Sequence, residues 1–358
     1  MSLPIVRLTG SPYDQGYAHG EQLYDRVTEN LSIYFDRFDR EVGLSRDEVL
    51  ERACLYAKAI ELQNPDYHAG MKGIAAATGV TLDEIAALNI RYEILYFEFG
   101  ASDYVDGCTS FALDCAASDN EHLLMGQNWD WIPNIKGALL HTKDDDGFAT
   151  LTFTEAGIFG GKIGLNSEGV GLSINGLTSM EDDWRRFAKP FHVRCYEILR
   201  QRTFKDATKI VTDEVRSCST NYVIGQAPNQ LVNIEAAPEK LNLIYPYGNR
   251  IAHANHFVDP LGTGIDEPED DRRPQSVSRH HRLEDLLALE QPMDQETLRN
   301  RLRDHDGHPN SICRHPDLND DDYDRYSTVT SVILDLTTQT LYASDGPPCE
   351  NPYDAHQV

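Results

Sequence analysis

The sequence predicts an α+β protein in which stacked β-sheets are covered by helices. Three observations support this prediction. Apolar side chains recur at helical spacing before Gly107, short alternating strands separated by turns follow it, and no internal repeat or low-complexity linker divides the chain. Hydrophobic residues make up 40% of the 358 residues, which is enough for a substantial core.

The first part of the chain, residues 1–107, is predicted to be mainly helical. A short strand is expected at residues 3–8, before the break at Gly10-Ser11-Pro12. Helical spacing then continues to about Tyr104. Thr81 and Glu84 form a capping box for a helix that runs through Leu88.

The second part, residues 108–358, is predicted to be rich in strands and to pack with the first part as one integrated domain. Two helices are expected at residues 191–202 and 206–215, and a third at 283–289 after a polar surface excursion over 266–282. The strands are expected at residues 109–115, 122–127, 149–155, 161–165, 170–175, 221–225, 231–236, 241–245, 328–335 and 340–344.

Acidic residues outnumber basic residues, with 58 Asp and Glu against 32 Lys and Arg and a formal net charge of −26. Such a surface repels nucleic acid and anionic membranes, so we expect neither as a partner. Carboxylates keep a protein hydrated where salt screens their mutual repulsion. We therefore expect a halophilic host and a fold that needs molar salt, with an ordinary acidic mesophilic protein as the alternative.

No targeting segment is expected in the chain. No stretch approaches the roughly 18 apolar residues of a membrane helix, and the first residues lack a basic start followed by an apolar run. We therefore expect a cytoplasmic protein. The seven cysteines include no Cys-x-x-Cys pair, which argues against a zinc ribbon or a thioredoxin-type site, so most should be buried free thiols.

One cysteine stands at the boundary between the two parts, in Gly107-Cys108-Thr109-Ser110. Glycine permits backbone geometries that self-cleavage exploits, and the Cys108 thiol can attack the Gly107 carbonyl in an N→S acyl shift followed by hydrolysis. The α-amine released on Cys108, with a reference pKa of about 7.7–8.0, can then take the thiol proton. A Gly-Cys pair alone is usually a buried thiol at a strand start, so the prediction depends on its neighbours.

Three polar side chains are expected to meet this thiol. Asp130 ends a strand that would pair beside Cys108, where it can orient or charge-stabilise the new N-terminus. Asn175 and Asn255 lie at strand ends, where their amides can donate hydrogen bonds to a developing oxyanion. Each of them alone is typical of a turn.

As a set, these motifs resemble the C45 peptidase family, which comprises acyl-coenzyme A:6-aminopenicillanate acyltransferase-like members of the N-terminal nucleophile hydrolases. The resemblance extends over nearly the whole chain. It rests on the segments 10–16, His19-Gly20, Gly107-Cys108-Thr109, Gln127-Asn128-Trp129-Asp130, Asn255-His256, 304–307, 309–313, 327–335 and Gly346-Pro347-Pro348-Cys349.

The resemblance implies a four-layer αββα sandwich and self-cleavage into an α-chain (1–107) and a β-chain (108–358) that stay associated. It maps the nucleophile onto Cys108, the carboxylate onto Asp130 and the oxyanion amide onto Asn255. Related bile-salt-hydrolase-like enzymes have a second such amide, which falls on Asn175. The implied activity is that of an amidohydrolase or acyltransferase acting on N-acyl amides or acyl thioesters without a cofactor.

The sequence departs from the family near the late strand, where members tend to carry an arginine. Thr330 or Ser331 stands at that place, and Arg325 lies at a shifted position. With His256, these residues are the candidates for the substrate pocket. Hydrolysis is favoured over acyl transfer because water is always present and no coenzyme A site is recognisable.

Two histidine groups are candidate metal sites, and no metal is expected at either. His253 and His256 lie in a strand-like context without a third ligand. The group His305, His308, His315 and Cys313 looks more like a metal cluster, but the interspersed Pro309 and Asn310 favour a hydrogen-bonded loop that shapes the substrate pocket.

The clearest basic patch comprises Arg272-Arg273 and Arg279-His280-His281-Arg282. It is expected to be a solvated face paired with neighbouring Asp and Glu, with capture of an anionic part of the substrate as the alternative.

Two other functions remain open. One is a conventional cysteine hydrolase that never cleaves, with Cys108 activated by a histidine such as His253 or His256. The other is a catalytically silent binding protein that keeps the fold.

Overall fold

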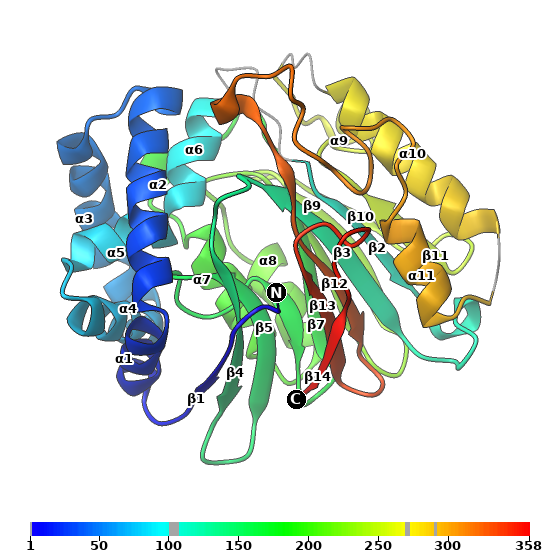
Figure 1. Ribbon diagram of the computed structural model, residues 1–358, viewed down its shortest axis with the longest axis horizontal. Coiled ribbons are helices and arrows are strands. Elements are labelled where there is room, and N and C mark those ends of the chain that lie inside the picture. Colours follow the sequence, from blue (N-terminus) through cyan, green and yellow to red (C-terminus); the bar gives the residue numbers. More distant parts are fainter. Residues whose placement is uncertain (1, 100–106, 269–272, 290–291) are drawn as a thin grey trace.

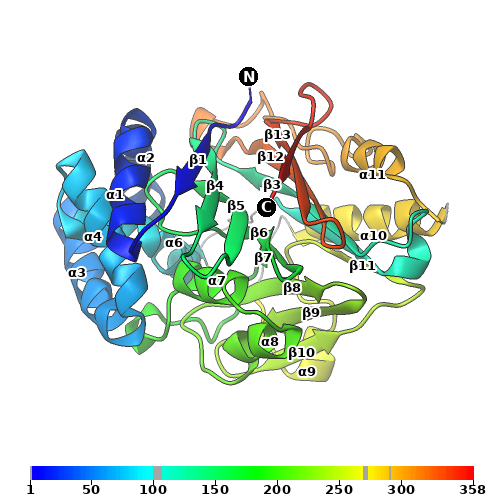
Figure 2. The same cartoon turned by 90° about the horizontal axis from the view of Figure 1, so that it is seen from below.

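The computed structural model describes residues 2–99, 107–268, 273–289 and 292–358. Two β-sheets face each other, with contacts between β3 and β7 and between β2 and β7. Helices α7 and α8 cover the outer face of one sheet, and α10 and α11 cover that of the other (Figures 1 and 2). This arrangement confirms both the α+β class and the four-layer αββα sandwich that the family resemblance implies.

The larger sheet has eight strands in the order β1-β4-β5-β6-β7-β8-β9-β10. Neighbouring strands are antiparallel except for the parallel pair β1–β4. The strands are β1 (Ile5–Leu8), β4 (Gly137–Lys143), β5 (Ala149–Glu155), β6 (Ile163–Asn166), β7 (Val170–Gly176), β8 (Thr220–Gln226), β9 (Gln230–Ala236) and β10 (Leu241–Ile244).

The smaller sheet has six antiparallel strands in the order β11-β2-β3-β12-β13-β14. Its register pairs Thr109 with Asn128, so β3 is the hairpin partner expected beside Cys108. The strands are β2 (Thr109–Leu113), β3 (Leu124–Trp131), β11 (Arg250–His253), β12 (Ser327–Asp335), β13 (Thr340–Asp345) and β14 (Asp354–Gln357).

In the described residues of the first part of the chain, a strand is followed by six helices that gather on one side of the sandwich (Figure 1). The predicted capping box at Thr81 and Glu84 is present at the start of α5. Residues 100–104, the end of the expected helical stretch, lie outside the described residues. The helices are α1 (Pro12–Gln22), α2 (Tyr24–Val42), α3 (Arg46–Gln63), α4 (Pro65–Thr78), α5 (Leu82–Asn89) and α6 (Arg91–Phe99).

The second part contributes helices α7 (Phe191–Leu199), α8 (Phe204–Thr212), α9 (Pro260–Thr263), α10 (Arg273–Leu289) and α11 (Gln295–Leu302). Within the described residues, no helix has the length and apolar character to cross a bilayer.

The expected surface excursion is wrong for residues 273–282, because α10 already starts at Arg273. The later half of α10 packs against the core through Leu283, Leu286 and Leu287. The earlier half buries polar side chains, so its sequence lacks the apolar spacing that predicts a helix.

The sequence patterns do not predict strand β4, nor do they predict β11, β14, α9 and α11. β4 lies between β1 and β5, and its residues Gly137–Lys143 are mostly buried on both faces. A strand buried on both faces shows no alternation of apolar and polar residues. Its sequence Gly-Ala-Leu-Leu-His-Thr-Lys therefore lacks the period that identifies a half-buried strand.

Candidate active site

Cys108 lies immediately before β2 and is fully buried. Its thiol donates to the backbone carbonyl of Asp130 on the neighbouring strand β3, with 3.7 Å between Sγ and O. Strand pairing thus brings Cys108 and Asp130 together, as the hairpin expectation requires. Side chains alternate along a strand, so Cys108 and Ser110 point to the face opposite that of Thr109.

Arg279 of α10 reaches the peptide bond before Cys108. Its Nη1 donates to the carbonyl oxygens of Gly107 and Cys108 at 2.6 and 2.7 Å, and to Thr109 Oγ1 at 2.9 Å. The side chain is 3% exposed. For Arg279 the expected solvated face is therefore wrong, whereas Arg282 does pair with Asp304 at 2.6 Å. Arg272, in the same predicted patch, lies outside the described residues.

Asn255 joins this group through Arg279. Nη2 of Arg279 donates to Asn255 Oδ1 at 3.1 Å, and Asn255 Nδ2 donates to the Gly176 carbonyl at 3.1 Å. The backbone N–H of Asn255 donates to Ser276 Oγ on α10 at 2.8 Å. The amide is therefore held between the end of β7 and α10, beside the cation that contacts Gly107.

Asn175 approaches from the opposite sheet. Its Oδ1 accepts hydrogen bonds from Ser110 Oγ at 2.6 Å and from Asn221 Nδ2 at 3.0 Å. Its buried Nδ2 has no hydrogen-bond partner among the described residues. An unpaired buried donor costs about 1–3 kcal/mol, and one that is fixed in place can stabilise charge that develops on a substrate oxygen. We call Cys108, Arg279, Asn255 and Asn175 the Cys108 site.

Gly107 is closely surrounded by side chains, so that a larger residue here would displace the Arg314 guanidinium. A Cβ atom built on it would lie 2.3 Å from Arg314 Nη1 and 3.0 Å from Asp130 Cβ. Asp130 is buried and its Oδ1 accepts from Thr328 Oγ1 at 2.7 Å, while the Arg314 N–H donates to the same hydroxyl oxygen at 3.0 Å. Arg314 was not recognised from the sequence, although it directly follows the 309–313 motif.

A buried ion cluster of Arg91, Glu155 and Lys162 lies within electrostatic range of Cys108. Lys162 Nζ contacts Glu155 Oε1 at 2.5 Å and lies 3.3 Å from the ring centroid of Trp129. Burial lowers the pKa of Lys162 to about 8, although the negative charge of Glu155 opposes this shift. Burial acts to raise the pKa of Glu155, but Arg91 and Lys162 outweigh it and hold that pKa well below its usual range.

Of the residues proposed for a substrate pocket, Arg325, Thr330 and Ser331 are bonded to groups outside the Cys108 site, whereas His256 shares Ser276 with Asn255. Arg325 pairs with Asp322 and donates to backbone carbonyls of its own loop. Thr330 donates to the Ser344 carbonyl, and Ser331 donates to Asn128. His256 Nδ1 contacts Ser276 Oγ at 2.8 Å, which places this imidazole beside α10.

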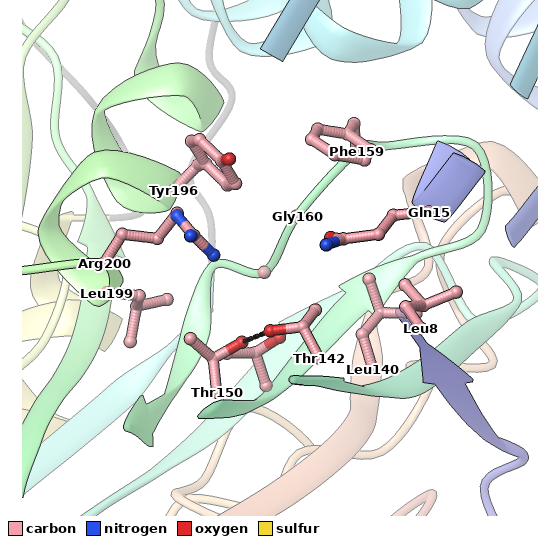
Figure 3. A pocket seen from close by; sticks show the side chains of 12 residues that line it. Leu8, Gln15, Leu140, Thr142, Thr150, Phe159, Gly160, Tyr196, Leu199 and Arg200 are labelled. Carbon is pink, nitrogen blue, oxygen red and sulfur yellow. Dashed lines mark hydrogen bonds between the residues drawn. The ribbon is translucent and has the colours of Figure 1, made fainter. Parts of the chain in front are cut away.

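A separate small cavity lies between α1, α7 and the strands β4 and β5 (Figure 3). Gln15, Phe159, Tyr196 and Arg200 surround it above the Thr142–Thr150 hydrogen bond. Its volume of about 20 Å³ holds roughly one water molecule. None of the residues of the Cys108 site lines it, so it gives no access to the thiol.

Several solved structures are similar to this chain at low identity, each with a TM-score below 0.5. The Caenorhabditis elegans orthologue of N-acylethanolamine-hydrolyzing acid amidase is 15% identical with a TM-score of 0.45, over 64% of this chain and 93% of that one. A mutant conjugated bile acid hydrolase from Clostridium perfringens is 10% identical with a TM-score of 0.47, over 70% and 97%. Penicillin V acylase from Agrobacterium tumefaciens is 11% identical with a TM-score of 0.45, over 66% and 83%.

Sequence comparison identifies the family. A relative from Emericella nidulans, the acyl-coenzyme A:6-aminopenicillanic-acid-acyltransferase 40 kDa form, is 28% identical over 351 residues, which cover 97% of this chain and 93% of the relative. The family model for acyl-coenzyme A:6-aminopenicillanic acid acyl-transferase matches residues 116–347, well over half of the chain. The chain therefore belongs to the acyl-coenzyme A:6-aminopenicillanic acid acyl-transferase family.

Proposed function

We propose that this chain is a self-cleaving cysteine enzyme that hydrolyses N-acyl amides, or transfers their acyl groups, through a thioester on Cys108. The observation that carries the proposal is that Arg279 Nη1 donates to two carbonyl oxygens, those of Gly107 and Cys108, at 2.6 and 2.7 Å. A buried cation on the carbonyl that precedes a buried thiol polarises the peptide bond that would be cut.

In the cleavage step, Sγ of Cys108 attacks the Gly107 carbonyl carbon while Arg279 stabilises the negative charge on the oxygen. The C–N bond breaks, the nitrogen takes the thiol proton, and a thioester between Gly107 and Cys108 forms. Water then hydrolyses the thioester, which leaves a carboxylate on Gly107 and a free thiol and α-amine on Cys108. The net change is the addition of one water molecule across the peptide bond.

In turnover, the α-amine of Cys108 acts as the base and the thiolate attacks the substrate carbonyl. Asn175 Nδ2 is the donor that we assign first to the oxyanion, because it is buried and makes no hydrogen bond to a described residue. Asn255 Nδ2 would first leave the Gly176 carbonyl. Asp130, bonded to Thr328, is assigned to orienting the new N-terminus.

The two chains produced by cleavage are proposed to stay together as a heterodimer. β1 pairs in parallel with β4, and Asn30 Nδ2 donates to the carbonyls of Lys136 and Ala156, both at 2.9 Å. Arg91 Nε donates to Glu155 at 3.0 Å. Separation would expose the apolar core that the two parts share and would leave these buried polar groups without partners.

Hydrolysis is the favoured reaction, with water as the acceptor for the acyl group. The alternative, a histidine-activated cysteine hydrolase that never cleaves, has less support. Both ring nitrogens of His253 are engaged, Nε2 with Glu235 Oε1 and Nδ1 with the Ala254 carbonyl, each at 2.8 Å. Neither nitrogen is available to take a proton from Cys108 without breaking one of these contacts.

We further propose that the protein acts in the cytoplasm of a halophilic host, on small molecules and without nucleic acid or membrane partners. The net charge of −26 supports this proposal. Repulsion among so many carboxylates is relieved when salt shortens the screening length. Thermal unfolding in dilute buffer and in molar KCl tests it, and an equal melting temperature in the two would contradict it.

The cleavage proposal is tested by intact-mass measurement and N-terminal sequencing of the purified wild type beside Cys108→Ala and Cys108→Ser. We expect two chains from the wild type, beginning at Met1 and Cys108, and one uncut chain from Cys108→Ala. Cys54→Ala is the matched control, because Cys54 is a half-buried thiol of α3. Hydrolysis is followed with a panel of N-acyl amides, and an uncut wild type that still hydrolyses them would contradict self-cleavage.

A further inference from the structure

Four sulfur and imidazole ligands converge from two distant segments of the chain. His305, Cys313 and His315 lie in the loop between α11 and β12, and Cys349 lies in the turn after β13. The candidate ligand atoms of these four residues all lie within 4.8 Å of one another. We call this group the His–Cys cluster.

The spacing of these atoms fits one tetrahedral ion. His315 Nε2 lies 3.1 Å from His305 Nε2, 3.3 Å from Cys349 Sγ and 3.8 Å from Cys313 Sγ, and the two sulfurs are 3.5 Å apart. Zinc bonds of about 2.3 Å to sulfur and 2.0–2.1 Å to nitrogen place the corners of a tetrahedron about 3.3–3.8 Å apart. Four of the six distances between the ligand atoms are therefore close to those of such a site, and the two between His305 and the sulfurs are at most 4.8 Å.

The surroundings hold the ligands in place. The Cys313 N–H donates to the Asp304 carbonyl and the His315 N–H donates to the Pro309 carbonyl, each at 3.0 Å. Nδ1 of His315, the nitrogen that does not face the cluster, lies 3.7 Å from a carboxylate oxygen of Glu350. A carboxylate on the far nitrogen is a common feature around zinc-bound histidine, where it fixes the ring and raises its basicity.

We propose that His305, Cys313, His315 and Cys349 bind one structural Zn²⁺ ion. Two thiolates with two imidazoles select zinc among the common divalent ions, and four protein ligands leave no open position for catalysis. The ion ties the 304–315 loop to the turn at 346–350. The sequence predicts a metal-free loop from three histidines and Cys313 alone. Cys349 is distant in sequence, and only the fold brings it to these residues.

The ion also has a consequence for the Cys108 site. Arg314 stands between two ligands, Cys313 and His315, and its guanidinium packs against Gly107. Binding at the cluster thus fixes the backbone on both sides of Arg314. Loss of the ion should loosen this residue without removing any group of the Cys108 site.

The test measures metal directly, in the full-length wild type and in Cys108→Ala, both purified with a reducing agent after growth with zinc. Elemental analysis should find about one zinc per chain in both proteins, because the cluster does not depend on cleavage. Cobalt exchanged into the site should give the visible bands of a tetrahedral ion and a sulfur-to-cobalt charge-transfer band in the near ultraviolet. This readout is independent of the outcome at Cys108.

Cys349→Ser is the informative variant because Cys349 is exposed and its replacement leaves no cavity in the core. We expect zinc in this variant to fall to about a tenth of the wild-type content or less, and the charge-transfer band to weaken. Cys115→Ser, at a half-exposed free cysteine outside the cluster, should keep both. Zinc-free wild type without cobalt bands, unchanged metal in Cys349→Ser, or a Cys313–Cys349 disulfide in the reduced preparation would each overturn the proposal.

Discussion

The two faces of strand β3 (Leu124–Trp131) hold different parts of the molecule. On the inner face, Gln127 donates to the Ile174 carbonyl of the facing sheet, and the Trp131 indole donates to the hydroxyl of Tyr34 in α2. On the outer face, Asn128 Nδ2 donates to the carbonyls of Leu302 and Ile312. The inner face therefore connects the two sheets and the first part of the chain, and the outer face supports the loop that carries the His–Cys cluster.

The Cys108 site takes residues from both faces of the sheet, and the strand register determines which residue contributes from which face. Thr109 lies opposite Asn128 and contacts Arg279 of the outer layer, whereas Ser110 points inward to Asn175. The cations near Gly107 thus come from the outer layer, and the Asn175 amide, with its unpaired Nδ2, comes from the inner face. We infer that self-cleavage depends mainly on the outer layer and that turnover depends mainly on the inner amide.

The largest effect is expected on the inner face, from Glu155→Gln. This change leaves the buried cations of Arg91 and Lys162 without their carboxylate, which should cost about 3–5 kcal/mol of unfolding free energy at pH 7. The folded-state pKa of Glu155 lies below its unfolded value, so its stabilisation is present above about pH 5 and is lost as the pH falls further.

Urea unfolding of the wild type and of Glu155→Gln between pH 7 and pH 3 measures both predictions. The variant should be less stable at pH 7 and should lose less stability than the wild type below pH 5. Asp36→Asn is the control, since it removes an exposed carboxylate paired with Arg40 and should change stability by about 0.5 kcal/mol or less. Equal pH profiles for the wild type and Glu155→Gln would contradict the assignment.

In the outer layer, Arg279→Met should slow self-cleavage by about 10²–10³-fold. Methionine keeps much of the length and apolar volume of arginine but cannot donate to the Gly107 carbonyl. Arg279→Lys keeps the charge but has a different donor geometry, so its cleavage rate should lie between those of the wild type and Arg279→Met. Time courses of precursor loss on denaturing gels measure the rates. Cleavage of Arg279→Met at the wild-type rate would remove Arg279 from the proposed step.

The inner amide is tested by Asn175→Ala, which should lower turnover of N-acyl amides by about 10²-fold while cleavage goes to completion. Ser110→Ala is the comparison, because it removes one hydrogen bond that orients the amide and leaves Nδ2 in place. It should reduce turnover less. Turnover per cleaved chain, measured at saturating substrate, reports the effect. A cleavage defect in Asn175→Ala as large as its turnover defect would erase the distinction between the two faces.

Local patterns in the sequence predicted much of the fold. The switch from helix to strand near Gly107, the strand at residues 149–155 and the capping box at Thr81 each depend on residues that are close in sequence. Strand β4 escaped because it is buried on both faces. The start of α10 escaped because Ser276 and Arg279 are polar and buried. A polar residue on a buried helix face has no signature in a single sequence.

At the site, too, the contacts that the sequence does not predict are those between residues distant in sequence. The position of Asp130 next to Cys108 followed from a hairpin expected between neighbouring strands. The contact of Arg279 with Gly107 joins residues 172 positions apart, and the meeting of Cys349 with Cys313 joins residues 36 apart. Long-range contacts of this kind are set by packing of whole layers, so local periodicity carries no information about them.

The smallest effect is expected at the outer face of β3, from Asn128→Leu. Leucine has a similar size but cannot donate to the Leu302 and Ile312 carbonyls, which would lose their partner in a buried setting, at a cost of about 2–3 kcal/mol. The loop at 303–315 should then exchange its amide hydrogens faster. Cleavage should slow by only about tenfold or less, because Arg314 is loosened while Arg279 stays in place. Hydrogen exchange read by mass spectrometry measures the loop, with Asn319→Ala at an exposed loop position as the control. Unchanged exchange at 303–315 in Asn128→Leu would mean that the outer face of β3 does not support the cluster loop.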